Sequence, residues 1–129
     1  MAGTLVANTI NTDTGLFSTQ NAYQGIAKAW VTFNGSTGAI SKSFNVSSVT
    51  LNTAGSNWTI NFTTAMPDAN YAIASTQNSF STGAVDGRQC ALAVNLGSQT
   101  TSAFTLYSYN TVSGGAGSAS GSTYVVVFD

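Results

Sequence analysis

Apolar and polar residues alternate one by one along several short stretches of this chain, the pattern of a β-strand that buries one face. The clearest case is residues 58–63, where Trp58, Ile60 and Phe62 are interleaved with small polar residues. No stretch of ten residues keeps the helical period of 3.6, and the strong helix formers Glu, Lys and Arg are nearly absent. The chain is therefore expected to be all-β.

The first long strand is predicted over residues 27–34, with Trp30 on the face opposite to its apolar residues. The pair Asn34-Gly35 begins a turn, so a hairpin to a second strand over residues 39–46 is expected. In that second strand, Ile40, Phe44 and Val46 are expected to face inward. The other strands are predicted over residues 58–63, 71–76, 89–96, 102–109 and 123–128.

The alternation of apolar and polar residues changes phase once, because Val49 and Leu51 stand at odd positions whereas Val46 stands at an even one. One extra residue reverses the facing of a strand, so a β-bulge is predicted near Ser47-Ser48. Roughly seven short strands separated by turns favour an antiparallel β-sandwich or jelly roll.

Two other segments differ from these strands. Residues 1–26 combine a short apolar stretch with several turn residues and are predicted to form an N-terminal arm, before a sandwich module over residues 27–129. The tract 113–122 is nearly all Gly, Ser and Ala. Such a tract orders weakly alone, so it is expected to be a loop tip or a segment held by a neighbouring subunit.

Charge is scarce, at 5% of residues, and the cations are Lys28, Lys42 and Arg88. This leaves no basic stripe for nucleic acid. The longest apolar runs, such as 124–128, are far shorter than the roughly 20 residues of a membrane span, so no span is expected. No secretory signal is visible, so synthesis in a cytoplasm is expected.

Scarce charge also bears on assembly. Sheet edges are normally protected by charged residues or Pro, and this chain has almost none of either. The edges are therefore expected to be covered by the arm or by sister subunits, which predicts an oligomer.

Catalytic groups are few. The chain has no His and no Glu, and its acids are Asp13, Asp68, Asp86 and Asp129. A Ser-His-Asp triad and a His- or multi-Cys zinc site are excluded within one chain. Asp68 with Asn70 offers oxygen ligands for calcium, but such residues in turns usually bond their own backbone. No enzyme activity, cofactor or metal is predicted.

Five residues are candidates for binding. Asp86 and Arg88 share one loop and are suited to a sugar hydroxyl or a partner carboxylate, although a solvent-exposed turn is the favoured explanation. Trp30, Tyr107 and Tyr109 are expected opposite the apolar faces of their strands. Such aromatics suit a sugar ring, a subunit interface or a second buried sheet face.

Three blocks carry a resemblance to a known family: AKAWVTFNG at residues 27–35, SFNVSSVT at 43–50 and FTTAMPDANY at 62–71. In this order they resemble a module in tail-fibre proteins of phages that infect marine bacteria. The resemblance covers roughly residues 27–76. In addition, residues 4–10 resemble the short N-terminal strand with which many such virion proteins begin. No catalytic residues are carried over.

The resemblance implies a virion appendage, commonly a homotrimer, with the module at the distal, host-facing end. It would contact other virion proteins through residues 1–26 and a glycan or protein of the host surface through the module. The chain has no long shaft, so a capsid decoration protein, whose arm docks on the shell, is the second hypothesis. A carbohydrate-binding module outside any virus is a third. The first two place the protein on the virion surface.

Overall fold

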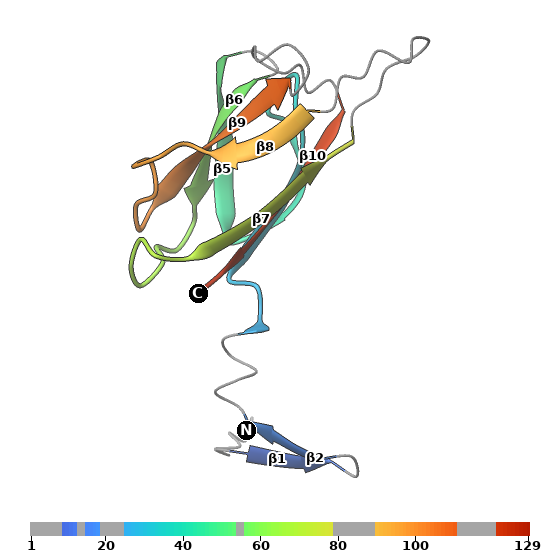
Figure 1. Ribbon diagram of the computed structural model, residues 1–129, viewed down its shortest axis with the longest axis vertical. Helices are drawn as coiled ribbons and strands as arrows, with labels where there is room; N and C mark the ends of the chain where they lie inside the picture. The colour runs from blue at the N-terminus through green and yellow to red at the C-terminus, as the bar shows by residue number, and fades with distance from the viewer. Residues whose placement is uncertain (1–8, 13–14, 19–24, 54–55, 79–89, 111–120) are drawn as a thin grey trace, which may run out of the picture.

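The protein is a β-sandwich of two four-stranded antiparallel sheets (Figure 1). The computed structural model describes residues 9–12, 15–18, 25–53, 56–78, 90–110 and 121–129. The predicted all-β sandwich is confirmed. Seven of the eight sandwich strands were predicted, because each alternates or runs apolar between turn residues, as β-strands do. The strand over Val46–Thr53 was not predicted as a separate element.

The first sheet has the strand order β4-β3-β10-β7 and the second has the order β5-β6-β9-β8. In the first sheet the strands are β3 (Ala29–Asn34), β4 (Ile40–Phe44), β7 (Ala72–Gln77) and β10 (Ser122–Phe128). In the second they are β5 (Val46–Thr53), β6 (Asn57–Phe62), β8 (Cys90–Val94) and β9 (Ala103–Asn110). Edge strand β7 lies beside β8, and β4 lies beside β5.

A separate hairpin lies within the segment predicted as an arm. It pairs β1 (Thr9–Thr12) with β2 (Gly15–Ser18) in antiparallel register. The apolar stretch Leu5-Val6, which the sequence favoured as a strand, lies outside the described residues.

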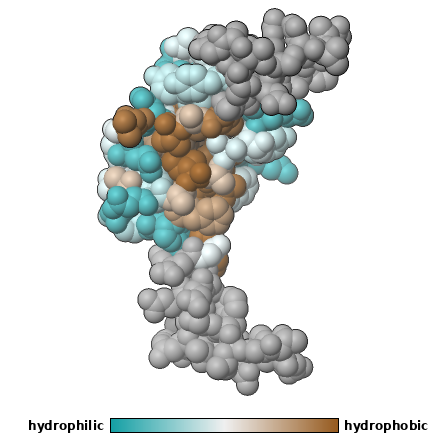
Figure 2. Space-filling view, viewed as in Figure 1, coloured by the Kyte–Doolittle hydropathy of each residue, from teal (hydrophilic) through white to brown (hydrophobic). Residues whose placement is uncertain are grey.

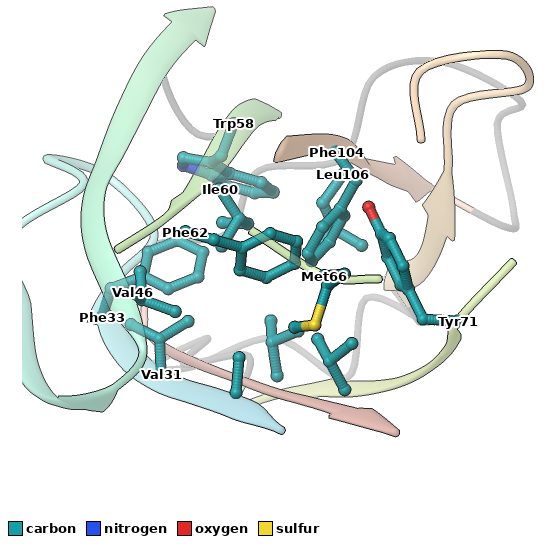
Figure 3. Packing of buried hydrophobic residues seen from close by; sticks show 13 residues of the cluster. Val31, Phe33, Val46, Trp58, Ile60, Phe62, Met66, Tyr71, Phe104 and Leu106 are labelled. Carbon is teal, nitrogen blue, oxygen red and sulfur yellow. The ribbon is translucent and has the colours of Figure 1, made fainter. Parts of the chain in front are cut away.

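The core fills the space between the two sheets (Figure 3). Trp58 is fully buried, packs edge to face on Phe33 with ring centroids 5.6 Å apart, and donates its indole N–H to Gly35 O at 2.8 Å. This bond satisfies the one polar group of the largest core side chain. The buried apolar residues are Ala29, Val31, Phe33, Val46, Trp58, Ile60, Phe62, Met66, Tyr71, Phe104, Leu106, Val125 and Val127.

The chain passes from the first sheet to the second at Asn45, between β4 and β5. Asn45 is the one non-glycine residue of the described part with a positive φ, 53°. Its Nδ2 donates to Lys28 O and Thr64 O, both at 3.1 Å, and its Oδ1 accepts from Thr64 N at 2.7 Å. Asn tolerates this left-handed conformation better than most residues. One side chain therefore fixes the corner that joins the sheets.

Two expectations for this region have different outcomes. The register of β5 on β6 shifts between Val46 and Ser48, which confirms the predicted β-bulge. The inward facing of Phe44 is wrong, because Phe44 pairs with Trp30 and is 54% exposed. Ile40 pairs with the buried Phe33 but remains 36% exposed at the sheet edge, while Val46 is buried. Strand β4 is exposed along its whole length because it is an edge strand that the second sheet does not cover.

Candidate functional site

The outer face of the first sheet carries large apolar side chains that the core does not bury. Trp30 on β3 is 37% exposed, Phe44 on β4 is 54% exposed and Tyr124 on β10 is 40% exposed. Val126, also on β10, is half-buried on the same side. These four residues are called the aromatic face below. They point outward because their strand neighbours, such as Val31 and Val125, fill the core.

The strand register places these residues next to one another. Phe44 pairs with Trp30, and Trp30 pairs with Val126. In the next row, Lys42 pairs with Thr32 and Thr32 pairs with Tyr124. Directly opposed residues lie about 5 Å apart and diagonal ones about 7 Å, so the three rings form one continuous surface across β4, β3 and β10.

A shallow hollow continues the aromatic face towards the edge of the sheet. It has a volume of about 240 Å³ and is lined by Ala74, Ser75, Thr76, Tyr124 and Val126. It exists because β7 presents only small side chains beside the large Tyr124. The hollow is smaller than the roughly 300–1,000 Å³ of pockets for drug-sized ligands, so it suits one ring-sized group.

Charge on this sheet is scarce: Lys28 stands directly before β3, where its backbone N–H donates to Val127 O, and one charged residue lies within the strands. Lys42 is exposed and is the only charged residue within the four strands β4, β3, β10 and β7. Asp129 follows β10, but it lies five strand positions from Tyr124, about 17 Å along an extended chain. Among the described residues, Lys42 is therefore the charged side chain that the strand register places in the row of Tyr124.

The outer face of the second sheet is built differently and is called the polar face below. Its residues bond one another across strands β5, β6 and β9. Asn61 Nδ2 donates to Ser48 Oγ at 3.0 Å and to Thr50 Oγ1 at 3.3 Å. Asn52 Nδ2 donates to Thr59 Oγ1 at 2.9 Å. These side chains satisfy one another and leave few groups for a ligand.

The structure separates the aromatic residues that the sequence proposed as one set. Tyr107 and Tyr109 lie on the outer side of the second sheet, with ring centroids 5.9 Å apart, while Phe104 and Leu106 are buried as expected. Trp30 lies on the outer side of the first sheet, so the sandwich stands between it and the two tyrosines. Asp86 and Arg88 lie outside the described residues.

A third surface is the open side of the sandwich between edge strands β7 and β8. Figure 2 shows apolar side chains gathered in a strip at this side. Partly buried Ile73, Leu92 and Val94 pack here against the core. Neither strand contains a charged residue or a Pro. Two edge strands without charge or Pro and an apolar strip therefore coincide on one side of the described sandwich.

The described residues offer little for catalysis or metal binding. Asp68 Oδ1 accepts a hydrogen bond from Asn70 N at 2.6 Å, which is the local turn that the sequence weighed against calcium. Within the described ranges there is no group of three or more His, Cys, Asp or Glu side chains able to hold a metal ion. In the same part of the chain, no helix is long and apolar enough to cross a membrane.

The sequence interpretation missed Phe44, Tyr124, Lys42 and the hollow. For Phe44, the alternation of apolar and polar residues predicted an inward side chain, whereas the side chain faces outward. Tyr124 stands in the run Tyr124–Phe128, where both faces of the strand are apolar, so alternation gives no facing. Only the strand order, which places β10 between β3 and β7, brings Tyr124 beside Trp30.

Comparison with known proteins gives no relative: no family model, no curated protein and no solved structure matches the chain.

Proposed function

We propose that this protein is a structural protein of a phage virion, a tail-fibre or receptor-binding tip that presents the aromatic face to the host. The observation that carries the proposal is this face itself: three exposed rings held on a rigid sheet whose other side is core. The larger apolar patches on the surface of a monomeric protein are often binding sites. The resemblance of residues 27–76 to tail-fibre modules supplies the kind of particle.

The proposal includes a homotrimer at the virion surface, made in the host cytoplasm, without catalysis. The open side between β7 and β8 supports self-association. Exposed strand edges pair readily with other strands unless charge or Pro protects them, and β7 and β8 have neither. A sister subunit on this side would cover both edges and the apolar strip, and would leave the aromatic face free.

A capsid decoration protein is the second candidate. The hairpin of β1 and β2 favours it, because this hairpin provides a paired element, within the predicted arm, for docking on a shell. Both candidates assign residues 1–26 to contacts with other virion proteins.

Electron microscopy of virions with a label on the N-terminal arm tests the proposal. Labels at the tail tip in a few copies are expected. Labels spread over the shell would contradict the fibre hypothesis and favour decoration, and virions without the protein would exclude both. Analytical ultracentrifugation of the purified chain tests the trimer, which a monomer at micromolar concentration would contradict.

A further inference from the structure

We propose that the aromatic face binds an acidic glycan, a sugar chain that carries carboxylate groups. The inference rests on the proposed host-facing role only for where such a chain is met. The binding surface consists of Phe44, Trp30 and Tyr124, the hollow beside Tyr124, and Lys42.

The size of the face argues for a small ligand over a second copy of the chain. An aromatic side chain contributes about 200 Å² of surface, so exposures of 37%, 54% and 40% leave about 260 Å² of ring surface open. A stable protein interface buries about 800 Å² on each partner. The ring surface is a third of that area, but it is ample for one or two sugar rings.

The chemistry of the face matches a sugar. The C–H bonds on one side of a sugar ring are weakly positive and pack well on the negative face of an aromatic ring. Sugar hydroxyls also need partners, and Thr32 and Thr76 lie next to the rings or line the hollow. Their hydroxyl groups both donate and accept hydrogen bonds, as sugar hydroxyls do.

Charge selects an acidic sugar and disfavours self-association. Lys42 lies in the same row as Tyr124, and no acid occurs within the four strands. An ammonium group beside the rings attracts a carboxylate through a charge-assisted hydrogen bond. Two copies packed through this face would instead bring two Lys42 side chains together without an acid between them, which is repulsive.

Isothermal titration calorimetry of the full chain with oligomers of galacturonic acid tests the inference, with neutral glucose oligomers of equal length as the comparison. The acidic oligomers are expected to bind at least about fivefold more tightly than the neutral ones, and rising NaCl is expected to weaken them. The variant Lys42→Gln, which removes charge from an exposed side chain and is expected to keep the fold, should remove this preference. Trp30→Ala should weaken binding about tenfold, a loss of 1.4 kcal/mol.

Tyr109→Ala is the matched control, because it removes a 47% exposed aromatic ring from the outer side of the other sheet. It should bind as the wild type does. The inference is overturned if neither oligomer binds, if both bind equally, or if the control loses as much affinity as Trp30→Ala. It is also overturned if Lys42→Gln or Trp30→Ala dissociates the oligomer while the oligosaccharides do not bind, since the face is then a subunit interface.

These outcomes are independent of the virion proposal. A chain that binds the acidic oligomers but is absent from virions would keep the glycan site and remove the virion role. A chain that is present in virions but binds neither oligomer would keep the virion role and remove the glycan site.

Discussion

The two outer faces of the sandwich belong to sheets of the same size, yet they manage exposure to water in opposite ways. On the polar face, Asn and Thr side chains bond one another across strands, as Asn61 does with Ser48 and Thr50. On the aromatic face, Trp30, Phe44 and Tyr124 stay 37–54% exposed. Only 5% of the residues are charged, yet small polar side chains hydrate the outer face of the second sheet. The low charge content therefore does not explain why the first sheet exposes aromatic rings.

The difference between the two outer faces indicates which of them binds a partner. On β5 and β6, polar groups that bond one another make a surface that needs no partner, while Tyr109 on the neighbouring β9 is also exposed. On the aromatic face, burying the exposed rings against a partner would contribute about 25 cal/mol of free energy for each Å² of apolar surface removed from water. This difference motivates the assignment of binding to the aromatic face and of a supporting role to the polar face.

The largest expected effect comes from breaking the corner that holds the two sheets back to back. Asn45→Ala removes three hydrogen bonds and leaves a left-handed backbone without the side chain that supports it. We expect a loss of about 3 kcal/mol in the free energy of unfolding, measured by denaturant titration. Asn45→Gly relieves the backbone but not the lost bonds, so it should recover about 1 kcal/mol. Equal stability of Asn45→Ala and wild type would contradict the role of this corner.

A pair of variants sharpens the comparison between the faces. Asn61→Ala on the polar face should cost about 1 kcal/mol, because it removes two cross-strand hydrogen bonds. Lys42→Gln on the aromatic face should change stability by less than about 0.5 kcal/mol, as exposed substitutions usually do. Thermal unfolding of both proteins measures the contrast. If Lys42→Gln costs as much as Asn61→Ala, Lys42 has a structural role that the aromatic face does not explain.

The interior between the faces contains one polar defect. Thr123 is fully buried, and its Oγ1 has no hydrogen-bond partner among the described residues. Thr123→Val replaces this hydroxyl with a methyl group, so we expect a gain of about 1 kcal/mol in unfolding free energy. A loss in the same denaturant titration would show that the hydroxyl has a partner in the folded protein.

The smallest effect concerns alkaline pH. Burial raises the pKa of Tyr71 above its ordinary value of 10.0, because the neutral phenol is favoured inside, where its O–H donates to Thr100 O. The folded state then holds its proton longer than the unfolded state, so stability is full below pH 10 and falls as the pH rises beyond it. Tyr71→Phe should flatten this fall, measured as unfolding free energy between pH 8 and pH 11. An unchanged slope would contradict the assignment.

Much of the fold followed from the sequence because alternation directly encodes one-sided burial. Trp58, Ile60 and Phe62 are buried as their pattern predicts, and the bulge after Val46 follows from a change of phase. The prediction for Phe44 failed because alternation shows that the two faces of a strand differ, but it does not show whether a second sheet covers the strand. The facing of Tyr124 was not predicted because β10 is apolar on both faces.

The candidate site was harder to predict because it is a property of strand order. Trp30, Phe44 and Tyr124 come from three strands, and the last is far from the others in sequence. Their adjacency depends on β10 pairing with β3. Side-chain type indicated that exposed aromatics mattered, but it grouped Trp30 with Tyr107 and Tyr109, which the sandwich separates.

The most direct test is the adsorption of virions to host cells, with virions shown to incorporate equal amounts of Trp30→Ala or Tyr109→Ala protein. The account predicts that Trp30→Ala slows adsorption about tenfold, in line with the loss of one aromatic contact, while Tyr109→Ala adsorbs like wild type. Equal adsorption of the two variants would contradict the claim that the aromatic face is the surface presented to the host.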